Sequence, residues 1–119
     1  MIELTKREDQ IMQIVWKLEK AFIRDVVEEL PEPKPHYNTV ATLIKILVRK
    51  GVLNSEMIGN THQYRPVQGF DEYRDTQIGD IKEKFFENSF SKLVAHFAKN
   101  ESLTEIEREE LIKIIKSKP

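Results

Sequence analysis

The sequence predicts a mainly helical protein with one small β-hairpin, and three observations support this prediction. Apolar residues recur at intervals of three and four along most of the 119 residues, which indicates amphipathic helices. Gly59-Asn60 separates two short runs of strand-forming residues, which indicates a hairpin with a two-residue turn. Gly51 stands directly before the first run, at a position where glycine commonly ends a helix. A helix that leads straight into a hairpin is the arrangement of a winged helix-turn-helix domain, which we expect over residues 1–68.

Two helices are expected before Pro31. Thr5 and Glu8 have the spacing of a capping box, in which each side chain binds the backbone N–H of the other residue. One apolar helix face follows, formed by Ile11, Ile14, Val15 and Leu18. A shorter second helix has the same spacing in Ile23, Val26, Val27 and Leu30. Proline cannot continue a helix, so the second helix ends where three prolines follow at alternate positions, Pro31, Pro33 and Pro35.

The third helix has a sharp division between an apolar and a polar face. The apolar face consists of Val40, Leu43, Ile44, Leu47 and Val48. At about 100° per residue, the opposite face carries Asn38, Thr42, Lys45 and Arg49. After Gly51, residues 53–58 and 61–65 are the two expected strands, and Pro66 ends the second.

The charge of the segment 34–66 differs from that of the whole chain. The segment has one acidic residue, Glu56, and five basic ones, which gives a local charge of +4: Lys34, Lys45, Arg49, Lys50 and Arg65. The whole chain has a net charge of −1. A local cluster of cations beside a polar helix face is the electrostatic pattern of a nucleic-acid-binding surface.

Residues of the third helix and the hairpin can be assigned roles on this hypothesis. Short polar side chains near the helix N-terminus suit base edges, and threonine methyl groups can also contact the thymine methyl; the candidates are Asn38, Thr39 and Thr42. Cations suit the phosphate backbone, and the candidates are Lys45, Arg49, Lys50 and Arg65. The wing would consist of Gly59, Asn60, Thr61 and His62. Alternatively, the helix is a solvated surface helix and the hairpin contacts nothing; the hairpin directly after the helix favours DNA.

Residues 69–119 are expected to form a helical dimerisation domain. Apolar residues from Ile78 to Phe97 keep helical spacing over about five turns, which predicts one long amphipathic helix. Thr104 and Glu107 form a second capping box before a last helix. Two helices are too small to bury so many large side chains alone, so we expect a homodimer. Its interface would contain Ile78, Ile81, Phe85, Phe86, Phe90, Leu93, Val94, Phe97, Leu111, Ile114 and Ile115. The alternative use of this face is a pocket for an apolar effector.

Composition argues against several other classes of protein. The chain has no cysteine, and His36, His62 and His96 lack the spacing of metal ligands, so neither a disulfide nor a metal site is expected. No nucleophile motif or phosphate-binding glycine loop is present, so we expect neither an enzyme nor a cofactor. No secretory signal and no apolar run of about 20 residues is visible, which predicts a cytoplasmic protein without membrane insertion.

The order of these segments resembles the penicillinase repressor family. The resemblance covers nearly the whole chain and is most specific in NTVATLIKILVRKGVL, in the wing ending QYRP and in LVAHFAKNESLTEIEREEL. It implies a dimeric winged-helix repressor of dyad-symmetric operators, commonly of antibiotic-resistance genes. It implies that the recognition helix spans residues 38–50, with Thr39 and Thr42 facing the bases. It also implies a membrane-bound sensor protease that cuts the dimerisation domain, with His96 and Phe97 flanking the candidate bond.

This chain departs from the family pattern at His96, at Ala41 and Ile46, and in its lack of cysteine. His96 stands where the β-lactamase repressors have asparagine, which affects the expected cleavage. Ala41 and Ile46 stand where those repressors tend to have basic residues, so a different operator is expected. The copper-responsive relatives have C-terminal cysteines, which are absent here. The competing hypothesis from another class is a winged-helix module that binds a protein partner instead of DNA.

Overall fold

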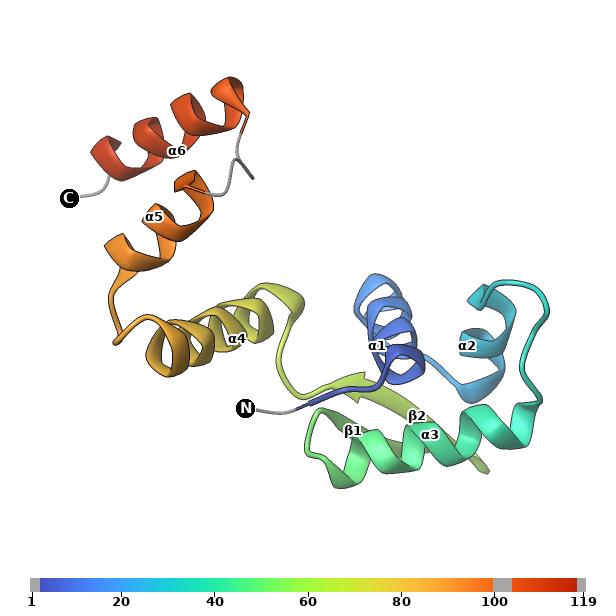
Figure 1. Cartoon of the computed structure of the whole chain (residues 1–119). Helices are drawn as coiled ribbons and strands as arrows, with labels where there is room; N and C mark the ends of the chain where they lie inside the picture. Colours follow the sequence, from blue (N-terminus) through green and yellow to red (C-terminus); the bar gives the residue numbers. More distant parts are fainter. Residues whose placement is uncertain (1–2, 100–103, 118–119) are drawn as a thin grey trace. The chain divides into compact units, whose positions relative to one another are not determined.

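The computed structural model describes residues 3–99 and 104–117 and confirms the predicted fold class, since the chain is mainly helical with one antiparallel hairpin (Figure 1). The elements in chain order are α1 (Lys6–Leu18), α2 (Ile23–Glu29), α3 (Tyr37–Arg49), β1 (Leu53–Ile58), β2 (Thr61–Pro66), α4 (Phe70–Phe85), α5 (Phe90–Lys99) and α6 (Glu105–Ser117). The chain divides into two compact units, Met1–Arg74 and Asp75–Pro119. The domain boundary expected after residue 68 stays a prediction.

The ends of the first two helices are fixed by side chains. At the start of α1, the Thr5 N–H donates to Glu8 Oε1 over 2.8 Å and the Glu8 N–H donates to Thr5 Oγ1 over 3.2 Å, so the predicted capping box is confirmed. At the start of α2, the Phe22 N–H donates to Asp25 Oδ2 over 2.9 Å. At its end, the ammonium of Lys34 donates to the carbonyl oxygens of three residues, Val27, Glu28 and Leu30. These contacts satisfy backbone groups that a helix cannot satisfy internally.

The hairpin has the predicted turn and pairs with one further residue. Its register runs from Leu53 opposite Pro66 to Ile58 opposite Thr61. Gly59 opens the turn with φ +63°, a conformation that glycine adopts without steric cost. Ala21 and Tyr64 exchange two backbone hydrogen bonds of 2.9 and 2.8 Å, so the link between α1 and α2 joins the edge of β2 through a single β-bridge.

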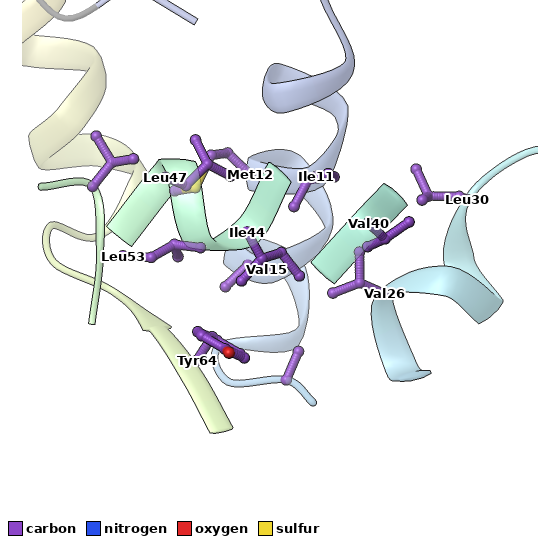
Figure 2. Packing of buried hydrophobic residues seen from close by; sticks show 12 residues of the cluster. Ile11, Met12, Val15, Val26, Leu30, Val40, Ile44, Leu47, Leu53 and Tyr64 are labelled. Atoms are coloured by element: carbon purple, nitrogen blue, oxygen red, sulfur yellow. The ribbon is translucent and has the colours of Figure 1, made fainter. Parts of the chain in front are cut away.

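The core of the first unit lies between its three helices and the hairpin (Figure 2). Its members are less than 6% exposed and include Ile11, Met12, Val15, Val26, Leu30, Val40, Ile44, Leu47, Leu53 and Tyr64. The three core residues of α3 lie on the apolar face that the sequence predicts. Because α3 contacts α1, α2 and β1, it is fixed in position with its polar face outward.

Trp16 attaches the first turn of α4 to α1. Its indole N–H donates to the carbonyl oxygen of Gln68 over 3.0 Å. Its ring lies 5.3 Å from that of Phe70 and 4.9 Å from that of Tyr73, measured between centroids. The first turn of α4 is therefore packed against the winged helix.

The single long helix expected from Ile78 to Phe97 is wrong. The structure ends α4 at Phe85 and begins α5 at Phe90. Between them, Glu87 and Asn88 have φ values of +53° and +57°, and the Ser89 hydroxyl accepts the N–H of Lys92. Asparagine tolerates this left-handed conformation and serine is a good N-cap, so local backbone preferences end the helix although the apolar spacing continues.

The second capping box is confirmed at the start of α6. The Thr104 N–H donates to Glu107 Oε1 over 3.2 Å, and the Glu107 N–H donates to Thr104 Oγ1 over 3.1 Å. In the described part of the second unit, no side chain of α4 or α5 is fully buried. The large apolar side chains that the sequence assigns to an interface are therefore exposed or half-buried in this unit.

Candidate DNA-binding surface

The outer face of α3 presents the polar side chains that the sequence singles out. Asn38, Thr39, Thr42, Lys45 and Arg49 are all exposed, while Val40, Ile44 and Leu47 on the inner face are fully buried. The polar residues of this face lie in the first two turns of the helix, before its first cation, Lys45. An exposed helix with this order can place polar groups against base edges and cations against phosphates.

His36 sets the N-terminus of α3, a role that the sequence analysis did not foresee. Its Nδ1 accepts the N–H of Asn38 over 3.0 Å. Its carbonyl oxygen accepts the N–H of Thr39 over 3.0 Å. Because Nδ1 is an acceptor, the ring proton is assigned to Nε2. The signal in the sequence was the position of His36 directly before a helical run, where a side-chain acceptor is favoured.

Tyr37 is a second residue that the sequence analysis missed. It is the first residue of α3, and its side chain is 48% exposed beside Asn38. Burial, and then the nearby Tyr37, raise the pKa of the Tyr64 phenol above its ordinary value of 10.0. Tyr37 therefore adds an exposed aromatic side chain to the start of α3.

Lys45 and Arg49 have no ion-pair partner within residues 3–99 and 104–117. Both lie on the outer face of α3, one turn apart. A cation without a protein partner is available to a phosphate at no cost of breaking an existing pair. These two residues are therefore the strongest candidates for backbone contacts.

Lys50 lies in a different environment. Its ammonium donates to Glu8 Oε1 over 2.7 Å and to the carbonyl oxygen of Glu3 over 2.9 Å. The Glu8 side chain is only 3% exposed. The hydrogen bond from Lys50, followed by that from the Thr5 backbone, lowers the pKa of the Glu8 carboxyl. Lys50 thus joins the end of α3 to the start of α1, and its phosphate contact stays a prediction.

Two further cations of the basic segment also have partners. Lys34 holds the carbonyl groups at the end of α2. Arg65 Nη2 lies 3.4 Å from Glu56 Oε2 across the hairpin, and both side chains are more than half exposed. An exposed pair of this kind contributes little to stability and is easily exchanged for a phosphate. Arg65 therefore remains available to DNA in a way that Lys34 does not.

The wing tip is exposed and has no metal site. Gly59, Asn60, Thr61 and His62 all lie at the surface, and the neighbouring Met57 is 57% exposed. The rings of His62 and Tyr64 are 6.3 Å apart. In the part of the chain that the structure describes, no group of three His, Cys, Asp or Glu residues could hold a metal ion.

The second unit has an open apolar face. Phe85, Phe90 and Phe97 are each more than 40% exposed. A hollow of about 550 Å³ lies on the same unit, lined by Ile81, Phe85, Phe86, Leu93, His96 and Phe97. Leu111 is half-buried, and the side chains of Ile114 and Ile115 lie outside the described residues. Of the predicted interface residues of α4 and α5, Ile78, Phe85, Phe90 and Phe97 are exposed, while Ile81, Leu93 and Val94 are half-buried.

The candidate cleavage bond lies inside a helix. His96 and Phe97 are both in α5, and the His96 ring lies 5.4 Å from that of Phe86 and 5.5 Å from that of Phe97. Asn100 and Glu101, at the end of the family-like stretch, lie outside the described residues. Separately, no helix in the described ranges is long and apolar enough to cross a membrane.

The chain is similar in sequence to proteins of one known family. The family model described as "Penicillinase repressor" matches residues 4–117. The chain is 24% identical to the penicillinase repressor of Bacillus licheniformis, an alignment that covers 95% of this chain and 89% of the relative. It is 26% identical to the methicillin resistance regulatory protein MecI of Staphylococcus aureus (strain N315), over 98% of this chain and 95% of the relative. A solved structure titled "CopR Repressor Structure" covers 56% of this chain and 97% of that chain, with 30% identity and a TM-score of 0.48.

Proposed function

The chain belongs to the penicillinase repressor family, and from this membership we propose that it represses transcription as a homodimer on a dyad-symmetric DNA operator. Its relatives are named as repressors and regulators, not as enzymes. Their names refer to penicillinase and methicillin resistance, so the proposed targets are resistance or signalling genes. A repressor acts where the chromosome lies, so the proposed location is the cytoplasm.

The observation that carries this proposal is the outer face of α3. A helix held on a buried core presents Asn38, Thr39 and Thr42, and then Lys45 and Arg49, which have no ion-pair partner in the part of the chain that the structure describes. In a winged-helix reader, the exposed helix enters the major groove and the hairpin approaches the backbone. We assign the three polar residues to base edges, and the two free cations and Arg65 to phosphates. The wing residues 59–62 would approach the backbone or the minor groove.

The apolar face of the second unit supports a dimer. One winged helix offers few phosphate contacts, so a single half-site binds weakly. Joining two winged helices makes the second contact intramolecular, which raises affinity by about 10²–10⁴. A second copy of the chain would cover Phe85, Phe90 and Phe97, which are exposed in one chain.

Cleavage in the second unit would reverse repression without any contact with DNA. A cut between His96 and Phe97 would divide α5 and remove α6 from the interface. The affinity gained from joining two half-sites would then be lost. We propose a membrane-bound sensor protease as the partner that makes this cut. Because the bond is helical, α5 has to unwind locally before a protease reaches it.

A second mode of regulation is favoured by the hollow on the second unit. Its aromatic and aliphatic lining suits an apolar effector. Such a molecule would occupy the space that a dimer partner fills, so it would act by weakening the dimer. Addition of the effector would then lower operator affinity and shift sedimentation toward the monomer together.

Selection of bound duplexes from a random DNA library, followed by titration of the enriched sequence at two salt concentrations, tests the proposal. We expect an enriched palindrome bound by two chains, with affinity that falls steeply with salt. Arg49→Ala should weaken binding to all sequences. It should also reduce the slope of log affinity against log salt concentration by about one for each half-site. Arg108→Ala, which removes an exposed arginine of α6, is the matched control and should leave the slope unchanged.

Two results would contradict the proposal. Retention of every sequence with equal affinity would indicate a nonspecific DNA binder. Absence of retention on DNA, combined with salt-insensitive binding of a protein partner, would favour the winged-helix interaction module instead.

A further inference from the structure

We propose that Thr42 selects thymine in the operator through its methyl group and not through its hydroxyl. The inference rests on the proposed function, because it concerns how α3 reads bases. It names the base at one position of each half-site and the chemical group that is recognised there.

The hydroxyl of Thr42 already has a partner in the helix. Thr42 Oγ1 donates to the carbonyl oxygen of Asn38, one turn earlier, over 2.9 Å. A threonine hydroxyl has a single hydrogen to donate. As long as this bond persists, the side chain can offer a base only its methyl group or an oxygen lone pair.

The methyl group is held in a fixed place by the same bond. Thr42 is exposed on the outer face of α3, so its methyl group is open to a ligand. A side chain already restricted to one rotamer loses little conformational freedom on binding. In the major groove, the apolar group that matches a threonine methyl is the C5-methyl group of thymine.

The next residue along this side of the helix is also apolar. Ile46 follows Thr42 by one turn and is half-buried, so part of it reaches the surface. α3 therefore presents a short apolar strip, formed by the Thr42 methyl group and Ile46. The strip lies between Asn38, which can donate and accept hydrogen bonds, and the cations Lys45 and Arg49. A base that places a polar group opposite this strip would lose the hydration of that group without gaining a hydrogen-bond partner. A thymine methyl group has no such hydration to lose.

Single replacement of each thymine by deoxyuridine in the selected duplex tests the inference, because it removes only the methyl group. We expect one thymine in each half-site whose replacement weakens binding by about fourfold, which corresponds to one buried methyl group. Thr42→Val retains methyl groups and lacks the hydroxyl, so it should keep this sensitivity. Thr42→Ser retains the hydroxyl and lacks the methyl group, so its affinity should fall about fourfold for each half-site and the sensitivity should disappear.

Thr76→Ser is the matched control, because it removes a methyl group from an exposed threonine outside the proposed DNA-binding surface. It should leave the sensitivity at the Thr42 position intact. The inference is overturned if no thymine responds to deoxyuridine, or if Thr42→Ser keeps the sensitivity and Thr42→Val loses it. In either case the parent protein would still select a palindrome, which separates this failure from that of the proposed function.

Discussion

At the scale of single residues, His36 determines how the recognition helix begins. Its Nδ1 satisfies the N–H of Asn38, next to the residues assigned to base contacts. We expect His36→Ala to lower the free energy of unfolding by about 1 kcal/mol, the usual cost of losing an N-cap, and His36→Ser to restore it. Urea unfolding followed by circular dichroism measures both. His62→Ala in the wing is the control, and equal stability of the two alanine variants would contradict the role of His36.

The pair of Glu8 and Lys50 predicts how stability depends on pH. Lys50 lowers the pKa of the Glu8 carboxyl below its ordinary value of 4.5, so the unfolded chain takes up this proton first. The pair therefore stabilises the fold fully above pH 4.5 and loses this contribution as the pH falls through the lower pKa of the folded state. Unfolding free energies measured across this acidic range should decline less steeply in Glu8→Gln than in the parent.

Removal of either partner of this pair should have unequal effects. Glu8 is buried and Lys50 is 33% exposed, so an unpaired Glu8 loses more hydration than an unpaired Lys50. At neutral pH, Lys50→Met should lower the free energy of unfolding by about 3 kcal/mol, and Glu8→Gln should lower it by about 1–2 kcal/mol. The second value is smaller because the lysine left without a partner is partly exposed. The double variant should be more stable than Lys50→Met. If Lys50→Met instead keeps full stability and only loses DNA affinity, the residue acts mainly on phosphates.

The contact between Glu8 and Lys50 could not be foreseen from the sequence, for a physical reason. Glu8 and Lys50 are separated by 42 positions, and nothing local links them. The sequence does indicate that Lys50 is a cation after a polar helix, and this led to its assignment to phosphates. Local patterns do identify Lys45 and Arg49 as surface cations, because their faces follow from helix periodicity alone.

At the scale of elements, helix boundaries were predicted most accurately where the capping residues and the apolar periodicity agree. The start of α1 follows from both the Thr5–Glu8 box and the apolar spacing, and the structure has it where expected. Between α4 and α5 the two signals disagree, because the spacing from Phe86 to Phe90 fits an unbroken helix. Periodicity reports which side chains are apolar, not whether the backbone between them is helical. The break was encoded in Asn88 and Ser89, whose local preferences prevailed.

The break between α4 and α5 can be tested at Asn88. Its φ of +57° is tolerated by asparagine and free of steric cost for glycine, but costs a β-branched residue about 1–2 kcal/mol. We expect Asn88→Gly to preserve thermal stability and Asn88→Val to lower it, both measured at one protein concentration. Asn88→Val should also increase the helical circular dichroism signal if α4 and α5 merge. Equal melting temperatures for both variants would mean that the break does not depend on this residue.

At the scale of the whole molecule, the proposed switch separates two tasks between two units. The first unit has a closed core and an outer face of polar residues and of cations that lack an ion-pair partner among the described residues, so we expect it to fold and to bind a half-site by itself. The second unit leaves its largest apolar side chains exposed. An exposed apolar face of this kind is typical of an interaction site, and the proposed self-association would let it control DNA affinity through valency alone.

The link between dimerisation and repression leads to a prediction at Phe85, which is 62% exposed in the single chain. Phe85→Asp should barely alter the folding of the first unit, because Phe85 lies in the second unit. It should convert the proposed dimer to a monomer, since a carboxylate in an apolar interface loses its hydration without a partner. Affinity for the full operator should then fall by about 10²–10⁴, while affinity for an isolated half-site stays unchanged.

Ile106→Asp provides the matched control for Phe85→Asp. Ile106 is 69% exposed in α6 and lies outside the predicted interface, so this variant gains the same charge at an equally open site. Sedimentation equilibrium and operator titration should show a dimer with full affinity. If Phe85→Asp remains dimeric, the chains associate through another surface. If it becomes monomeric but keeps full operator affinity, repression does not depend on joining two half-sites, and a cut in the second unit could not act as the switch.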